Sequence, residues 1–307
     1  MRKPKKNNKG DSKDRYRMSD FTARKIGVVP NKSGRYRLNK EKKKLFFDLD
    51  QSKIKRLFYD IETSQYEVRS FRIGYKLNLG YHNVTKLAKI ICVSWKWEGE
   101  DKIHNLKWDS KMCDKKMLES FIEVLNKADE IVAHNGDRFD IKWIRTRALF
   151  HKIPMKAKYR SLDTLKKAKS NFNFPNNRLD TIAQFLGVGA KVEHDGMKMW
   201  DAVQDGDKDY LNEMVKYCDG DIVVLEDVYF EMQPYVINNT HVGAHNDKMK
   251  CSCPSCASED VSLLKNSFTA LGTIKREIEC NSCGYVYETS NSAWRTFVEM
   301  KQNNQIK

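Results

Sequence analysis

Four acidic residues and a tyrosine, spread over three short segments, are the strongest candidates for catalysis. Asp60 and Glu62 stand two residues apart in a hydrophobic, strand-like segment, so their carboxylates project to the same face of a strand. Asp140 closes a polar stretch at the start of a predicted helix. Tyr217 and Asp221 are four residues apart in a long helical pattern, which puts both on one helix face.

Carboxylates that share a pocket repel one another and are costly to remove from water, so such a cluster makes physical sense mainly around cations. Oxygen ligands suit Mg²⁺ or Mn²⁺. Two such ions about 4 Å apart clamp the attacking and leaving oxygens of an in-line displacement at phosphorus. The pattern therefore predicts two-metal phosphodiester chemistry, for which no Ser, Cys or His nucleophile is needed.

A second constellation, late in the sequence, is made of cysteines. Two Cys-x-x-Cys pairs, the second beginning 24 residues after the first ends, are a strong signal for tetrahedral zinc. The expected ligands are Cys253, Cys256, Cys280 and Cys283, with Cys251 as a spare or an alternative. Strand-like segments at 261–264 and 273–278 resemble those of a zinc ribbon, a small three-stranded sheet clamped by one structural ion. A disulfide framework is the competing interpretation, and it conflicts with the lack of a secretory signal.

The elements that must position these residues form an alternating pattern between residues 55 and 235, which indicates an α/β fold with helices layered on a sheet. Strands are predicted at 55–63, 88–97, 101–106, 130–134 and 159–162. Helices are predicted at 112–127, 139–150, 179–186 and 210–235, with one more after Asp163, which would cap it.

Charge divides the chain unevenly. Residues 1–56 contain 20 Lys or Arg and 6 Asp or Glu, a net +14, out of +15 for all 307 residues. This segment is either a phosphate-binding arm or a solvated tail, and a strand-like stretch at 45–49 suggests docking on the body. We expect four regions: a basic arm at 1–54, an α/β domain at 55–236, a linker at 237–249, and a zinc ribbon with its tail at 250–307.

Composition excludes several classes of protein. Hydrophobic residues make up 40% and aromatic residues 11% of the chain, enough for a buried core. No apolar run reaches the length of roughly 18 residues that a membrane span needs, and the cationic N-terminus lacks the apolar segment of a secretory signal. The sequence therefore predicts a soluble, cytoplasmic protein in a reducing compartment, without membrane association.

The order and spacing of the three acidic motifs resemble those of the 3′–5′ exonucleases of the ribonuclease-H-like superfamily, across roughly residues 55–235. Asp60-Ile-Glu-Thr follows a hydrophobic strand, Asn135-Gly-x-x-Phe-Asp140 comes about 75 residues later, and Tyr217-x-x-x-Asp221 about 80 residues after that. A sister subgroup has histidine one position before the tyrosine, where this chain has Lys216. The tyrosine subgroup, DEDDy, is therefore the better match. Within it, the chain looks most like the proofreading domains of family B DNA polymerases and their stand-alone viral and bacterial relatives.

The resemblance implies a mixed sheet flanked by helices and a role for each matching residue. Asp60, Glu62, Asp140 and Asp221 would hold two Mg²⁺ or Mn²⁺ ions, and Tyr217 would orient the attacking water. Asn135 and Phe139 would position the terminal nucleotide. The implied activity is divalent-metal-dependent 3′–5′ hydrolysis of single-stranded DNA ends in replication proofreading or repair. Because no polymerase domain fits after Tyr235, proofreading would require a polymerase or another replication protein as partner.

Two alternatives stay open at this point. The chain could be a catalytically silent adaptor that binds nucleic acid and recruits a partner, or its substrate could be RNA, since the phosphate is common to both nucleic acids. Nearby residues are expected to have ordinary roles. A solvated helix face is favoured for Arg138, Arg145 and Arg147, a satisfied structural role for His134, and core packing for Phe172, Phe174 and Trp200.

Overall fold

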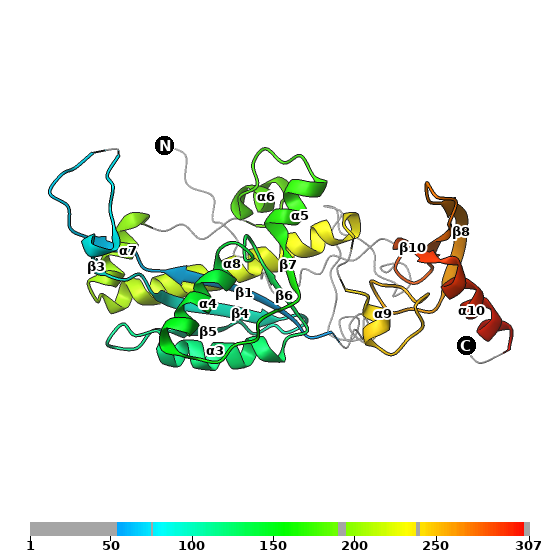
Figure 1. The fold of residues 1–307 in the computed structure, drawn as a ribbon, viewed down its shortest axis with the longest axis horizontal. Helices are drawn as coiled ribbons and strands as arrows, with labels where there is room; N and C mark the ends of the chain where they lie inside the picture. Colours follow the sequence, from blue (N-terminus) through cyan, green and yellow to red (C-terminus); the bar gives the residue numbers. More distant parts are fainter. Residues whose placement is uncertain (1–53, 75, 190–194, 238–239, 304–307) are drawn as a thin grey trace, which may run out of the picture. The chain divides into compact units, whose positions relative to one another are not determined.

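The computed structural model describes residues 54–303, except 75, 190–194 and 238–239 (Figure 1). Residues 54–237 form one compact unit, and the described residues from 240 onward belong to another. The predicted basic arm, apart from its last residue, and the strand-like stretch at 45–49 lie outside the described residues. Within the described part of the chain, no helix combines the length and the apolar character that crossing a bilayer requires.

A mixed five-stranded sheet forms the centre of the first unit, with strand order β5-β4-β1-β6-β7. The strands are β1 (Arg56–Thr63), β4 (Ile90–Trp97), β5 (His104–Lys107), β6 (Glu130–Ala133) and β7 (Ser161–Asp163). The first three pair in antiparallel fashion, whereas β6 runs parallel to β1 and β7 parallel to β6. The predicted mixed sheet is confirmed, including the return of the third strand beside the second.

Helices cover both faces of this sheet (Figure 1). They are α3 (Lys115–Lys127), α4 (Asp140–His151), α5 (Thr164–Asn171), α6 (Leu179–Leu186), α7 (Met197–Gln204) and α8 (Lys208–Met232), the last followed by the short helix η3 (Gln233–Tyr235). Alternate residues of β1 face opposite layers: Leu57, Tyr59 and Ile61 pack with α3 and α4. Phe58 packs with α6 and α8. This alternation places Asp60 and Glu62 on the α8 side.

Some helix ends follow from local chemistry. Asp163 is the N-cap of α5, with its side chain accepting hydrogen bonds from the amides of Leu165 and Lys166, as predicted. Gly187 ends α6 with φ 65°, the left-handed conformation that glycine adopts without strain. The sequence did not predict α7, nor the two-stranded hairpin of β2 (Glu67–Val68) and β3 (Val84–Lys86). The short helix η2 (Tyr81–Asn83) lies inside this hairpin, directly before β3.

The second unit contains a three-stranded antiparallel sheet in the order β10-β9-β8. Its elements are α9 (Val242–His245), β8 (Val261–Phe268), β9 (Ile274–Cys280), β10 (Val286–Ser290) and α10 (Asn291–Gln302). The expected three-stranded sheet is therefore present. Two helices were not predicted: α9 lies inside the segment expected to be linker, and α10 buries Phe297 against the small core of this unit.

Candidate metal centre and cysteine cluster

The first unit gathers three of the predicted carboxylates. Oxygens of Asp60, Glu62 and Asp221 lie within 4.8 Å of one another. The first two are alternate residues of β1, so they lie on the same face of the strand, and the third lies in the middle of α8. Asp221 is only 3% exposed, whereas Asp60 and Glu62 are half-buried. The group is thus open on the strand side and closed on the helix side.

Helix α8 is held directly against β1 at this point. The Cys218 Sγ lies 3.5 Å from the backbone oxygen of Asp60 and 3.7 Å from its Oδ2. Tyr217, one helical turn before Asp221, is 7% exposed, and its ring meets that of Trp200 edge-on with centroids 6.2 Å apart. The small thiol lets the helix approach the strand closely, and the tyrosine ring is fixed by α7.

Asp140, the fourth predicted carboxylate, stands outside the group of three but interacts with it electrostatically. It is 2% exposed at the first position of α4. Burial, together with the negative charge of Asp60, raises the pKa of Asp140 well above its usual value, although hydrogen bonds from its own amide and that of Ile61 oppose the rise. Among the described residues, its Oδ1 has no hydrogen-bond partner. An orphaned carboxylate oxygen beside other acids is the arrangement expected of a cation ligand.

The loop before Asp140 is held by backbone hydrogen bonds. Asn135 has φ 68°, and its carbonyl accepts from the amides of Arg138 and Phe139 over 3.1 and 3.0 Å. Its own amide donates to the Asp163 Oδ1 over 3.0 Å. The sequence predicted Asp163 only as a helix cap. Its second role was detectable in principle, because an acid that ends one parallel strand lies next to the loop that leaves the neighbouring strand.

Gly136 and Phe139 show how closely this loop is built. A Cβ on Gly136 would lie 2.5 Å from the Cβ of Ala133, so only glycine fits. Phe139 is 39% exposed and meets Trp143 edge-on, with ring centroids 6.3 Å apart. The predicted pair of Asn135 and Phe139 therefore stands immediately before Asp140, with the phenylalanine ring partly open to solvent.

Neighbouring residues mostly behave as the sequence predicted. His134 contacts the Thr164 Oγ1 and the Asn177 carbonyl, each over 2.9 Å, so it is a satisfied structural histidine. The side chains of Phe172, Phe174 and Trp200 are partly buried against the core.

Arg147 departs from the predicted solvated helix face. It is buried and forms two hydrogen bonds with the Asp114 carboxylate, over 2.7 and 2.9 Å. A partner 33 residues away cannot be identified from the helix pattern alone.

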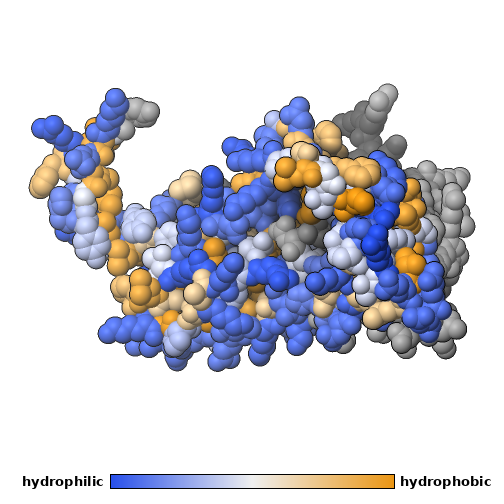
Figure 2. Space-filling view, turned by 45° about the vertical axis from the view of Figure 1, so that its right-hand side comes forward, coloured by the Kyte–Doolittle hydropathy of each residue, from blue (hydrophilic) through white to orange (hydrophobic). Residues whose placement is uncertain are grey.

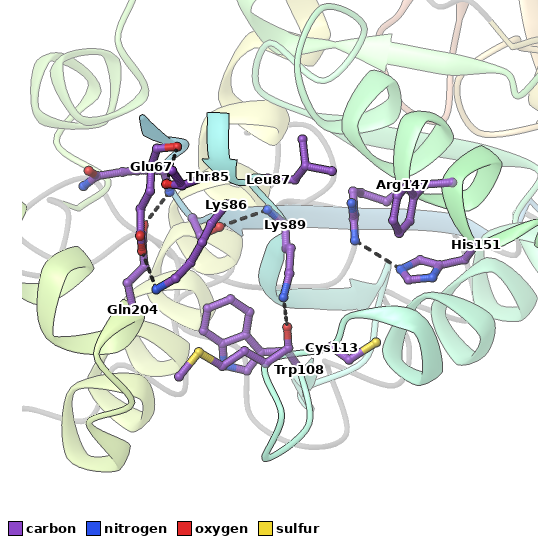
Figure 3. A pocket seen from close by; sticks show the side chains of 14 residues that line it. Glu67, Thr85, Lys86, Leu87, Lys89, Trp108, Cys113, Arg147, His151 and Gln204 are labelled. Carbon is purple, nitrogen blue, oxygen red and sulfur yellow. Dashed lines mark hydrogen bonds and ion pairs between the residues drawn. The ribbon is translucent and has the colours of Figure 1, made fainter. Parts of the chain in front are cut away.

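A cavity of about 460 Å³ lies beside Arg147, between β3, the residues just before β4 and the end of α4 (Figure 3). Its cations are already engaged: the Lys89 Nζ donates to the Met112 carbonyl over 2.9 Å, and Arg147 is committed to Asp114. The His151 Nε2 also contacts Asp114, over 2.7 Å. The cluster of Cys113, Asp114 and His151 is consequently a neutralised ion-pair site and a poor metal centre.

The second unit brings together the four predicted cysteine ligands. The sulfurs of Cys253, Cys256, Cys280 and Cys283 lie within 4.8 Å of one another. Two of the contacts, Cys253 with Cys283 and Cys256 with Cys280, are 3.6 Å. Cys251 is buried outside this group, with its sulfur 3.9 Å from the Thr289 Oγ1. Four thiols gathered from two tight turns fit a closed tetrahedral zinc site.

Comparison with known proteins adds one assignment. A family model described as the RNase_H superfamily matches residues 57–233. No curated protein matches the sequence. One solved structure to which the chain is similar is that of the family B DNA polymerase from the hyperthermophilic archaeon Pyrobaculum calidifontis, with 13% sequence identity and a TM-score of 0.45. This similarity covers 59% of the chain and 25% of the polymerase chain, so the chain spans about a quarter of the polymerase's length.

Proposed function

Because the chain belongs to the RNase H superfamily, we propose that it is a divalent-metal-dependent 3′–5′ exonuclease that hydrolyses phosphodiester bonds at single-stranded DNA ends. Superfamily membership supports nuclease function in general. The observation that carries the finer proposal is the group of Asp60, Glu62 and Asp221 within 4.8 Å, with a tyrosine one helical turn from the last of them.

The residues fit a pair of hard cations. Four carboxylates, Asp60, Glu62, Asp140 and Asp221, would hold two Mg²⁺ or Mn²⁺ ions, and oxygen donors are what these ions prefer. The buried Asp140 Oδ1 would gain the partner that it lacks among the described residues. When bound, the ions would activate a water and stabilise the leaving 3′-oxygen.

Protein side chains would supply the positioning. The Tyr217 hydroxyl would accept a hydrogen bond from the attacking water and so orient it. Its ring is held by Trp200, and its helix is held against β1 by Cys218. Phe139 offers a half-open ring face to the terminal base, and Asn135 offers an amide side chain beside it. Substitution Tyr217→Phe keeps the ring packing and removes the hydroxyl. We expect it to lower kcat by roughly 10²-fold with KM little changed, because a loss of positioning at the reacting centre slows a reaction by about that factor.

In the second unit, one structural Zn²⁺ held by Cys253, Cys256, Cys280 and Cys283 would stabilise the ribbon. A closed site leaves no position for water, so the ribbon would serve docking. We propose a polymerase or another replication protein as the partner. The charge of residues 251–307 is balanced, six basic against six acidic, which does not favour nucleic acid as the ligand of this unit.

Digestion of a 20-nucleotide single-stranded DNA labelled at its 5′ end tests the activity and its direction together. A ladder of shortening labelled products in Mg²⁺ is expected, whereas digestion from the 5′ end would release labelled mononucleotide at once. Asp60→Ala should abolish the ladder, and Glu123→Ala, at an exposed acid of α3, should leave it intact. Activity of the Asp60→Ala protein equal to that of the wild type would overturn the proposal. A matching RNA strand in parallel decides between the two substrates.

A further inference from the structure

The hairpin of residues 67–86 leaves the body of the first unit immediately after the carboxylate strand. It comprises β2, β3 and the described residues between them, and it is closed at its base by hydrogen bonds between Ser64 and Lys89, both 2.9 Å. Unlike the strands of the central sheet, the hairpin has no buried residue among those that the structure describes. Large apolar side chains are exposed along it: Val68, Phe71, Ile73, Leu77, Leu79 and Tyr81. Phe71 and Ile73 are exposed completely.

Cations are interleaved with these apolar side chains. Glu67 is the hairpin's one acidic residue, and it pairs with Lys86 over 2.8 Å. Arg69, Arg72 and Lys76 are exposed, and no ion pair joins them to any residue that the structure describes. Figure 2 shows hydrophilic and hydrophobic side chains next to one another on this projection, at the left of the view. The hairpin thus carries three exposed positive charges, without an ion pair in the described part of the chain, beside an unburied aromatic ring.

The base of the hairpin is attached to the candidate metal centre. The Gln65 amide donates to the Gln204 Oε1 of α7 over 2.6 Å, and α7 also carries the Trp200 that packs on Tyr217. A cavity of about 440 Å³ lies between these two segments, lined by Thr63, Ser64, Gln65, Gly196, Met197 and Trp200. The cavity starts one residue after Glu62. Its lining residue Gln65 stands two positions before the hairpin, so the cavity lies between the carboxylate strand and the hairpin along the chain.

A row of three aromatic rings also connects the candidate metal centre with the base of the hairpin, by way of α4. Tyr66 at the hairpin base lies 6.4 Å from Trp143 of α4, ring centroid to ring centroid, and Trp143 lies 6.3 Å from Phe139. Tyr66 is 54% exposed and Phe139 is 39% exposed. The row therefore runs from the residue before Asp140 to the start of the hairpin, with open ring surface at both ends.

We propose that the hairpin and this aromatic row form a binding surface for the single strand that leads into the metal centre. Aromatic side chains stack on bases without sequence preference, while nearby cations follow the phosphates. This surface has both features, because exposed rings and three exposed cations, Arg69, Arg72 and Lys76, occur together along it. The inference rests on the proposed nuclease function for the direction of the strand, but the binding itself is independent of catalysis.

A charge-matched pair of variants tests the surface. The hairpin variant combines Arg69→Ala, Arg72→Ala, Lys76→Ala and Phe71→Ala. The control variant combines Lys116→Ala, Lys127→Ala, Lys158→Ala and Leu149→Ala, four exposed residues on other segments. Dissociation constants for a fluorescent 20-nucleotide oligo(dT), and for oligo(rU), are measured by anisotropy with a chelator present, at several salt concentrations. The chelator prevents metal-dependent turnover, so binding is measured whether or not the protein is an exonuclease.

We expect the hairpin variant to bind both strands at least tenfold more weakly than the control variant does. Its log Kd should depend less steeply on log salt, by about 2, because each lost phosphate contact on a single strand removes about 0.7 from the slope. Tyr66→Ala should weaken binding as well, whereas Tyr66→Phe, which keeps the ring, should not. Equal affinity and equal salt dependence for the two quadruple variants would overturn the proposal and leave the exposed hairpin as a protein-docking element.

A second measurement separates this proposal from the proposed function. In Mg²⁺, the ratio of kcat/KM on a 20-nucleotide strand to that on a dinucleotide should fall at least tenfold in the hairpin variant relative to the control variant. Absence of hydrolysis in the wild type, with hairpin-dependent binding in the chelator experiment, would reject the nuclease function and retain the binding surface. An unchanged ratio in an active enzyme would reject the binding surface alone.

Discussion

Asp163 holds Asn135 in place: the Asp163 Oδ1 accepts a hydrogen bond from the Asn135 amide over 3.0 Å, at the end of the neighbouring parallel strand. The same carboxylate accepts from the amide of Asp137 through its Oδ2, over 3.3 Å. It also caps α5 through the amides of Leu165 and Lys166. One buried acid therefore fixes both a helix start and the loop that delivers Asp140 to the carboxylate group.

Replacing Asp163 by alanine should affect stability and activity together. Loss of the cap should lower the free energy of unfolding by about 1–2 kcal/mol. Loss of the two loop contacts should lower kcat by roughly 10–100-fold, because small displacements of a positioned group slow the reaction by such factors. Urea unfolding and single-turnover digestion of labelled DNA measure the two effects.

Asp163→Asn separates the two roles. Asparagine caps helices as well as aspartate does, so the stability should stay close to that of the wild type. Its side chain has a single acceptor oxygen, however, and cannot serve Asn135 and Asp137 from separate oxygens as the carboxylate does. Reduced kcat in a protein of normal stability is expected. Full activity in Asp163→Asn would show that the loop contacts do not position the site.

Mutual repulsion among the clustered carboxylates predicts that metal binding changes the stability of the fold. Among the residues that the structure describes, the Asp140 Oδ1 has no hydrogen-bond partner, and the negative charge of Asp60 acts on it, so without metal this side chain destabilises the fold. In chelator, Asp140→Asn should be as stable as the wild type or more stable, by up to about 1–3 kcal/mol. Mg²⁺ at 100 times its dissociation constant should stabilise the wild type by about 2.7 kcal/mol, and the variant by clearly less.

Thermal unfolding with and without Mg²⁺ measures this difference. Glu123→Gln, which changes an exposed acid of α3 by the same chemistry, is the matched control and should respond to Mg²⁺ as the wild type does. A melting temperature of the wild type that is indifferent to both Mg²⁺ and Mn²⁺ would contradict the metal assignment.

What the sequence could and could not predict follows from the range of the interactions. The two-residue spacing of Asp60 and Glu62 and the four-residue spacing of Tyr217 and Asp221 are local, so strand and helix geometry determined their common faces in advance. The mixed sheet was also predictable, because its strands are short apolar segments rich in β-branched residues. The ion pair of Asp114 with Arg147 was not, since neither residue carries a local signal of its partner.

Two other elements, the hairpin of residues 67–86 and α9, escaped prediction because they lack a buried periodic face. The hairpin of residues 67–86 has apolar side chains that point to solvent, so neither a strand nor a helix period is visible in it. Helix α9 has only four residues and lies in a segment rich in Asn, His and Gly. In the cysteine cluster, by contrast, the ligand spacing is itself local and specified the four residues that meet.

The Asp114–Arg147 pair predicts a pH dependence of stability. Burial raises the pKa of Asp114, but hydrogen bonds from Arg147, His151 and the Ile90 amide outweigh it and hold the pKa below its usual value of 3.8. The folded state therefore binds this proton less readily than the unfolded state does. The carboxylate stabilises the fold above about pH 4, and this contribution is lost as the pH falls through the lowered pKa.

Asp114→Asn should cost about 3–5 kcal/mol near neutral pH, because Arg147 is left buried without a counter-charge. The difference from the wild type should stay constant from pH 7 to about pH 4 and shrink as the pH falls further through the lowered pKa, which urea unfolding at several pH values down to about 2.5 measures. The double variant Asp114→Leu/Arg147→Met should be less destabilised than Asp114→Asn, since it removes both charges. A difference that stays constant over the whole pH range would exclude the pair as its source.

The cysteine cluster predicts one zinc ion per chain and distinguishes its ligands from their neighbour. Cys280→Ser should lose the zinc, because a hydroxyl cannot replace a thiolate in a tetrahedral site with four sulfur ligands. Cys251→Ala should keep it, since this sulfur lies outside the group and its side chain acts as a small buried hydrophobe. Metal analysis of the purified proteins gives the stoichiometry, and hydrogen exchange of residues 251–290 shows whether the sheet loses protection with the ion. Zinc retained by Cys280→Ser, or lost from Cys251→Ala, would mean that the four sulfurs brought together here are not the ligand set.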